Sequence, residues 1–134
     1  MRKQAEGAVL LTGGTGYIGS HTAVELLARG ETVILVDDLS NSRADVVDRL
    51  ERITGRRPIF YPADAGDSAA MERIFSAHPI GAVLHFAGFK AVGESVRQPV
   101  AYYRNNLDTT LTLLERMAAH GVKRFVFSSS ATVY

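Results

Sequence analysis

Three glycines, Gly13, Gly16 and Gly19, form the clearest chemical pattern in the chain. They lie in the stretch TGGTGYIGSHT, residues 12–22, between a β-rich run and a helical pattern. In that setting glycines let the backbone turn tightly and approach a pyrophosphate, while the helix N-terminus offers free N–H groups and a partial positive charge. The pattern therefore predicts a dinucleotide-binding loop. A tight turn with a close helix–strand contact is the simpler explanation of Gly19 alone.

A triphosphate-binding P-loop is the main rival explanation of these glycines. Gly14 and Gly19 have the spacing of the two P-loop glycines, but Ser20 stands where that motif requires Lys. Nothing in the stretch would then reach the terminal phosphates of a nucleotide, so the dinucleotide interpretation is favoured.

An acidic residue, Asp37, follows the second β-rich run, 18 positions after Gly19. A carboxylate there can accept hydrogen bonds from both hydroxyls of the adenosine ribose, and its charge would repel the 2′-phosphate of NADP. Asp38 adds a second negative charge, whereas Arg43 is close enough to keep NADP as an option. A solvated Asp at a strand end is the alternative. The pair of acids predicts NAD as the cofactor.

Short β-rich runs alternate with longer helical patterns along the whole chain. Such alternation predicts an α/β fold with right-handed crossovers, a Rossmann-type doubly wound parallel sheet in the strand order 3-2-1-4-5. Strands are expected at residues 8–12, 32–36, 59–61, 82–86 and 124–128, and helices at residues 17–29, 43–53, 68–77 and 99–120.

The carboxyl ends of these strands should carry the ligand, since ligands of doubly wound sheets lie there. Asp64 could accept from the amino group of adenine while the N–H of Ala65 donates to the ring. Residues 86–88 and 128–130 follow the fourth and fifth strands, and Lys90 could donate to a ribose hydroxyl. A turn-forming Asp and a solvated loop Lys are the alternative interpretations.

Two further polar positions lie inside predicted elements. Asn105 and Asn106 occur within a strong helical pattern, where Asn is mildly unfavourable, so at least one should face a polar ligand or a loop backbone. His85 lies within a buried strand pattern and is expected to be a hydrogen-bonded core residue.

The composition excludes several classes of function. The net charge of +1 over 134 residues gives no electrostatic case for nucleic acid or an acidic membrane surface. The chain has no Cys and its four His are not at metal-ligand spacing, so no metal site is expected. No apolar run approaches the roughly 20 residues of a membrane helix. A cytoplasmic location is expected.

Four stretches together resemble the extended short-chain dehydrogenase/reductase family, and within it the UDP-hexose 4-epimerases. They are TGGTGYIGSHT at 12–22, FAGFKAVGESV at 86–96, YYRNN at 102–106 and FSSSATVY at 127–134. The resemblance covers the chain beyond a few N-terminal residues. It implies that residues 1–134 are an incomplete NAD-binding Rossmann domain, truncated after the fifth strand and without the C-terminal part that binds the sugar nucleotide. It also implies a homodimeric parent enzyme.

The resemblance assigns roles residue by residue. Tyr17 and Ile18 would touch the pyrophosphate, and Ser130 would hydrogen-bond the reacting oxygen of the sugar, although Ser130 could equally be a strand-end turn residue. Lys90 would contact both cofactor and substrate. The remaining cofactor contacts would be Asp37, Asp38, Leu39, Ser40, Asn41, Ser42, Asp64, Ala65, Phe86, Ala87, Gly88, Phe89 and Asn105.

The implied chemistry is transient oxidation of a UDP-sugar at C4, with a Tyr-x-x-x-Lys pair supplying the base. No Tyr in the chain has Lys four residues later, and the pair is expected beyond Tyr134. A sugar-nucleotide 4,6-dehydratase is one alternative, although Ala131 and Thr132 stand where those enzymes carry an acidic pair. A non-enzymatic NAD(H)-binding module is another. The chain does not determine which hexose or N-acetylhexosamine is accepted.

Overall fold

The computed structural model of the chain describes residues 7–13, 17–38, 45–86 and 99–127. Five parallel strands form one sheet in the order β3-β2-β1-β4-β5, which confirms the predicted fold class and strand order. The strands are β1 (Ala8–Thr12), β2 (Val33–Val36), β3 (Ile59–Tyr61), β4 (Ile80–His85) and β5 (Arg124–Phe127).

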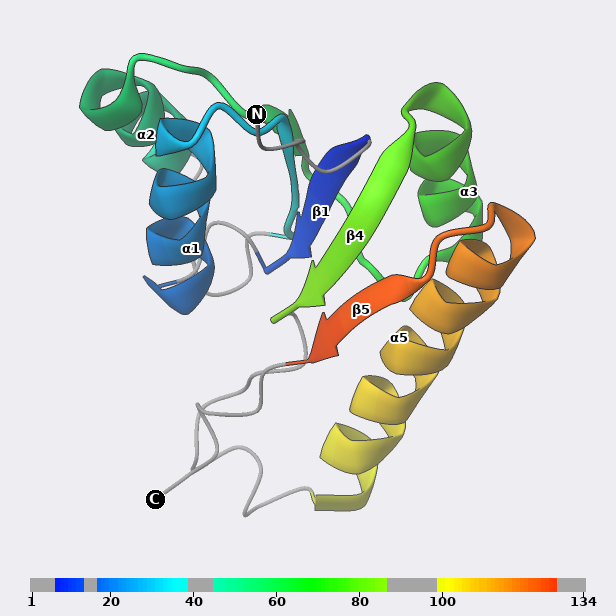
Figure 1. Cartoon of the computed structure of the whole chain (residues 1–134). Coiled ribbons are helices and arrows are strands. Elements are labelled where there is room, and N and C mark those ends of the chain that lie inside the picture. The colour runs from blue at the N-terminus through cyan, green and yellow to red at the C-terminus, as the bar shows by residue number, and fades with distance from the viewer. Residues whose placement is uncertain (1–6, 14–16, 39–44, 87–98, 128–134) are drawn as a thin grey trace.

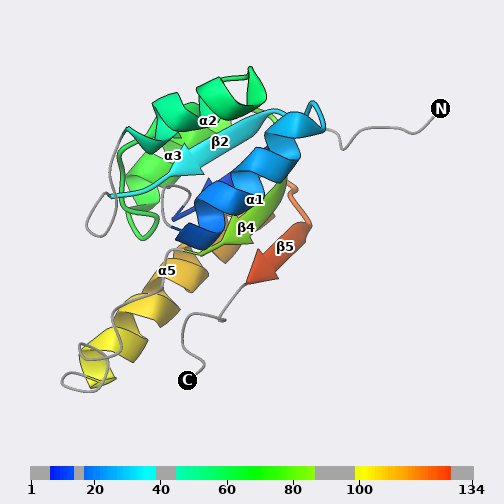
Figure 2. The same cartoon turned by 90° about the vertical axis from the view of Figure 1, so that its left-hand side faces the viewer.

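Helices cover both faces of this sheet, as Figures 1 and 2 show. The helices α1 (Tyr17–Ala28) and α2 (Val46–Thr54) pack on one face, and α3 (Ser68–Ala77) and α5 (Pro99–Ala119) pack on the other. This two-sided arrangement is what an all-parallel sheet requires, since both of its faces must be removed from water.

Two hydrophobic cores result, one on each face. Leu10, Ile34 and Val83 project towards α3 and α5, where they meet Met71 and Leu113. The neighbouring strand residues, including Leu11 and Leu35, alternate to the other face and meet Leu27 and Leu50 of α1 and α2. Burial of each such side chain contributes roughly 1.5–3 kcal/mol. Every residue of β1 is buried, and this central strand sets the register of the two strands that pair with it, β2 and β4.

The element boundaries differ from the predicted ones by a few residues. Strand β4 begins at Ile80 rather than at residue 82, because the Ala8 N–H donates to the Pro79 carbonyl at 2.6 Å and extends the pairing. Helix α2 begins at Val46, three residues later than expected. Helix α3 begins as predicted, with the Asp67 carboxylate accepting from the N–H groups of Ala69 and Ala70.

Strand β5 lies at one edge of the sheet and, within the residues that the structure describes, pairs with β4 alone. Two of its apolar side chains are largely exposed, Val126 to 55% and Phe127 to 48%. An exposed edge strand with apolar side chains presents unpaired N–H and C=O groups to other chains.

We therefore expect the 134-residue chain to self-associate through β5. Light scattering should detect oligomers whose population grows with protein concentration. Val126→Lys should shift the equilibrium towards the monomer, because a Lys on an edge strand opposes strand pairing. Ala119→Lys adds the same charge at the end of α5 and serves as the control. A monodisperse parent chain whose β5 amides exchange as slowly as those of β1 would contradict this account.

Candidate dinucleotide site at the carboxyl edge of the sheet

The glycine loop begins at the carboxyl end of the central strand, as predicted. Gly13 has φ of +72°, a backbone conformation that favours glycine, and its N–H donates to the Val36 carbonyl at 2.7 Å. Helix α1 begins only four residues later, at Tyr17, and carries no acidic residue in its first turn. Gly19 is buried within the helix. The turn and the helix N-terminus together suit an anion such as a pyrophosphate.

Asp37 lies directly beside this turn. Its backbone continues from Val36, the residue that accepts from Gly13, and its own N–H donates to the Tyr61 carbonyl at 3.2 Å. The side chain of Asp37 is half-buried, while that of Asp38 is exposed. The backbone of strand β2 therefore carries a carboxylate next to the glycine turn, where the sequence predicts a ribose contact.

The segment after β3 contains the two residues predicted to hold adenine. Asp64 is exposed, and its Oδ1 accepts a hydrogen bond from the Gly66 N–H at 2.8 Å. Ala65 is only 4% exposed because its side chain packs into the core beneath α3 and α5. An adenine contact of Ala65 would thus involve its backbone, whereas Asp64 presents its side chain to solvent.

Thr12 and His85 form a buried pair at the ends of the two central strands. Oγ1 of Thr12 lies 2.6 Å from Nδ1 of His85, and both side chains are fully buried. The Phe86 N–H donates to the Thr12 carbonyl at 2.9 Å and to Oγ1 at 3.2 Å. His85 is thus a hydrogen-bonded core residue, as the sequence predicts.

Burial favours the neutral imidazole of His85. Oγ1 of Thr12 accepts from the Phe86 N–H and keeps both its hydroxyl hydrogen and a second lone pair for Nδ1, so this contact is compatible with either tautomer of the ring. Nε2 is buried and has no hydrogen-bond partner among the described residues. The rings of Phe125 and Phe127 flank the imidazole, with centroids 6.2 and 5.3 Å away. Burial lowers the pKa of His85 to about 4.

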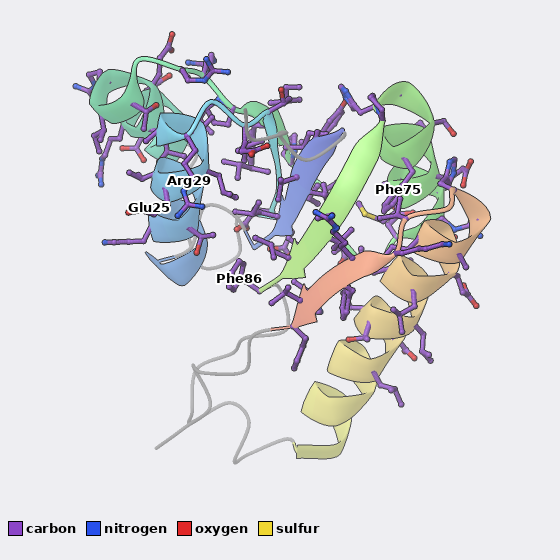
Figure 3. The ribbon with its side chains drawn as sticks, in the orientation of Figure 1. Glu25, Arg29, Phe75 and Phe86 are labelled. Atoms are coloured by element: carbon purple, nitrogen blue, oxygen red, sulfur yellow. The ribbon has the colours of Figure 1, made fainter. Side chains whose placement is uncertain are left out.

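Phe86, the first residue after β4, turns to the opposite side of the sheet. It packs with the cluster beneath α1 and α2, and Figure 3 shows it at the end of β4 towards α1. Phe86 therefore lies on the α1 side of the sheet, beside the end of β1.

Sequence reasoning did not single out Thr12, although it ties β1 to the segment after β4. The signal was a hydroxyl residue that ends an otherwise aliphatic strand immediately before the glycines. Several predicted contacts lie outside the described residues, and for Tyr17, Ile18 and Asn105 the structure describes only the helical backbone. Those outside are Gly16, Leu39, Ser40, Asn41, Ser42, Ala87, Gly88, Phe89, Lys90 and Ser130.

Neither a metal cluster nor a membrane span emerges from the described ranges. Among residues 7–13, 17–38, 45–86 and 99–127, no three His, Cys, Asp or Glu side chains could together hold a metal ion. The helices within the same ranges are too short or too polar to cross a membrane.

The fold and the strand ends define the class of a dinucleotide-binding α/β domain. The particular family follows from the sequence, which matches the NAD dependent epimerase/dehydratase family over residues 9–134. The chain belongs to this family.

Individual relatives agree with that assignment. The chain is 54% identical over 129 residues to a UDP-glucose 4-epimerase of Schizosaccharomyces pombe, covering 96% of the chain and 36% of the relative. It is 53% identical to one of Klebsiella pneumoniae, covering 94% of the chain and 91% of that relative. The crystal structure of UDP-glucose 4-epimerase from Bifidobacterium longum in complex with NAD+ and UDP matches with a TM-score of 0.89 and 53% identity, over 95% of the chain and 38% of that structure.

The pKa of His85 predicts how stability depends on pH. The folded pKa of about 4 is below the ordinary value of 6.5, so between these values the unfolded chain binds a proton that the folded chain does not. The free energy of unfolding should therefore fall as the pH is lowered, by about 2 kcal/mol between pH 6.5 and 5 at ~1.36 kcal/mol for each pKa unit. Urea unfolding at a series of pH values measures this fall.

In the variant His85→Asn the free energy of unfolding should change less with pH. The control variant His21→Gln, on the exposed side of α1, should keep the pH dependence of the parent chain. Measurements stay above pH 5 because Glu72, whose pKa His120 and Arg116 lower to about 2, adds its own loss of stability below pH 4.5. An unchanged slope in His85→Asn would show that another group titrates.

Proposed function

We propose that this chain is the NAD-binding part of a UDP-glucose 4-epimerase. The observation that carries the proposal is the pairing of the Gly13 turn with Asp37 at one sheet edge, in a member of this family. The chain spans just over a third of the length of the S. pombe relative, so the activity belongs to a protein with the remaining parts as well. The names of the relatives favour an epimerase over a dehydratase.

The described residues fit NAD. The first turn of α1, free of acidic residues, and the Gly13 turn would bind the pyrophosphate, and the carboxylate of Asp37 would accept from the ribose hydroxyls. Asp64 would accept from the adenine amino group. A bound NAD supplies a reversible hydride acceptor for the sugar C4, as the family description implies.

The substrate proposed is a UDP-sugar, which is interconverted between UDP-galactose and UDP-glucose. The residues of this chain that would act on it are Ser130, whose hydroxyl would hydrogen-bond the oxygen at C4, and Lys90. The general base would lie in the remaining part of the protein. This activity places the protein in galactose metabolism, and we propose a cytoplasmic location.

We also propose that the complete enzyme is a homodimer. On α5, Leu107, Leu111 and Leu114 recur at spacings of four and three and are exposed to 59, 48 and 42%. Side chains at this spacing share one helix face. An apolar stripe of this kind on a helix supports association with an equivalent surface.

Cofactor preference provides the first test. NADH should bind more tightly than NADPH in a fluorescence titration of the chain, because Asp37 accepts from the ribose and repels a 2′-phosphate. Asp37→Ala should weaken NADH binding about tenfold, as expected for the loss of hydrogen bonds to a charged group. The variant should also show a smaller difference in affinity between NADH and NADPH. Asp48→Ala on the exposed face of α2 is the matched control. Equal NADH affinity in Asp37→Ala would reject this role.

Activity provides the second test. The chain alone should not convert UDP-galactose to UDP-glucose, because it lacks the Tyr-x-x-x-Lys pair. A chimera that joins residues 1–134 to the remaining part of the S. pombe relative should be active in a coupled assay. In the chimera, Ser130→Ala should lower kcat more than it raises KM, since the hydroxyl acts on the reacting oxygen. Ser76→Ala, on the surface of α3, is the control. A change confined to KM would restrict Ser130 to binding.

A further inference from the structure

Helix α5 approaches the segment after β3 unusually closely at one residue, Gly66. A methyl group placed on Gly66 would lie 3.2 Å from Oγ1 of Thr109 and 3.4 Å from Oδ1 of Asp64. Thr109 is only 5% exposed. One turn further along α5, the hydroxyl of Thr112 donates to the Gly66 carbonyl over a long 3.4 Å. Two hydroxyl residues of one helix face thus meet a single glycine of the segment.

Gly66 in turn orients the carboxylate of Asp64. Its N–H donates to Oδ1 at 2.8 Å, while the Asp64 carbonyl accepts from the Asp67 N–H at 2.9 Å. Oδ2 of Asp64 has no partner among the described residues, and the side chain is exposed. One carboxylate oxygen is therefore bonded within the segment, which restricts the exposed side chain and leaves the other oxygen for a further donor.

The segment is anchored on both sides of Gly66. Ala65 is buried in the core with Leu113 and Met117 of α5, and the Asp67 side chain caps α3. A shift of Gly66 would consequently be passed to the Asp64 carboxylate rather than absorbed elsewhere. Because hydrogen-bond strength falls steeply with poor geometry, small shifts would weaken any contact that Oδ2 makes.

We propose that Thr109 and Thr112 are positioning residues for the adenine end of the dinucleotide. The Thr112 hydroxyl holds the Gly66 carbonyl and Thr109 closes the space beside Gly66, so that through the Gly66 N–H they aim Oδ2 of Asp64 at the amino group of adenine. The side chains of α5 thereby set selectivity for adenine without touching it. This inference rests on the proposed function of the same edge as an NAD site.

The test compares NADH with reduced nicotinamide hypoxanthine dinucleotide, whose base carries an oxygen in place of the amino group. Binding of either dinucleotide is followed by the fluorescence of its reduced nicotinamide ring. The measured quantity is the ratio of the two dissociation constants for the 134-residue chain. The parent chain should prefer adenine about tenfold, since hypoxanthine presents a carbonyl oxygen where adenine presents the amino group that donates to the carboxylate. Asp64→Ala should abolish the preference.

The positioning role predicts that Thr112→Val, which removes the bond to the Gly66 carbonyl, lowers the ratio by at least about threefold, and that Thr112→Ser, which keeps the hydroxyl, retains the parent ratio. Gly66→Ala should lower it too, because the added methyl displaces Oδ1 or Thr109. Thr110→Val, on the neighbouring position of α5, is the matched control and should keep the parent ratio.

Several outcomes decide between this inference and its rivals. Equal loss of affinity for both dinucleotides, with an unchanged ratio in the threonine variants, would mean that these residues serve stability alone and would overturn the inference. A parent chain that prefers adenine through Asp64 while every α5 variant keeps that preference would overturn it as well. A parent chain that binds neither dinucleotide, although folded by circular dichroism, would reject the NAD site itself and the inference with it.

Discussion

The end of β1 is the constraint on which the rest of the structure depends. Thr12 and Gly13 together connect both neighbouring strands. The Gly13 N–H donates to Val36 at the end of β2, and the two oxygens of Thr12 accept from Phe86 just after β4. These bonds align the carboxyl ends of β1, β2 and β4 at the same edge of the sheet. Each of these ends is followed by a segment with predicted cofactor contacts. A shift of β1 by one residue would exchange its two buried faces and separate all three segments.

The polar groups at this edge are tolerable because Thr12 and Nδ1 of His85 are satisfied locally, although Nε2 of His85 has no partner among the described residues. Thr12 and His85 would be costly if buried alone, but they hydrogen-bond each other and the backbone of Phe86. They lie between the aliphatic core and the edge of the sheet at which the dinucleotide is proposed to bind. At Asp64 likewise, one carboxylate oxygen accepts from the Gly66 N–H, and the other is the proposed acceptor for adenine.

Much of this arrangement was predictable from the sequence, because it depends on local patterns. Strand–helix alternation and crossover handedness gave the sheet order, and the glycines marked the turn after β1. The missing pieces depend on contacts between distant segments. Thr112 meets Gly66 across 46 residues and Thr12 meets His85 across 73, so neither pair leaves a mark in any single stretch. Periodicity in α5 marks Leu107, Leu111 and Leu114, which are exposed, whereas Thr109, Leu113 and Met117 form the buried face, so the pattern alone does not show which face meets Gly66.

Electrostatics links the glycine turn to the acidic residues beside it. A helix N-terminus carries roughly half a positive charge, which favours an anion there, and α1 places no carboxylate of its own in competition. The negative charges instead lie at Asp37 and Asp38, one strand away, where a neutral ribose can donate to them and a phosphate would be repelled. A dinucleotide with two bridging phosphates and an unmodified ribose satisfies both requirements at once. On the proposed site, the charge distribution at one sheet edge would thus favour NAD over NADP and over a triphosphate.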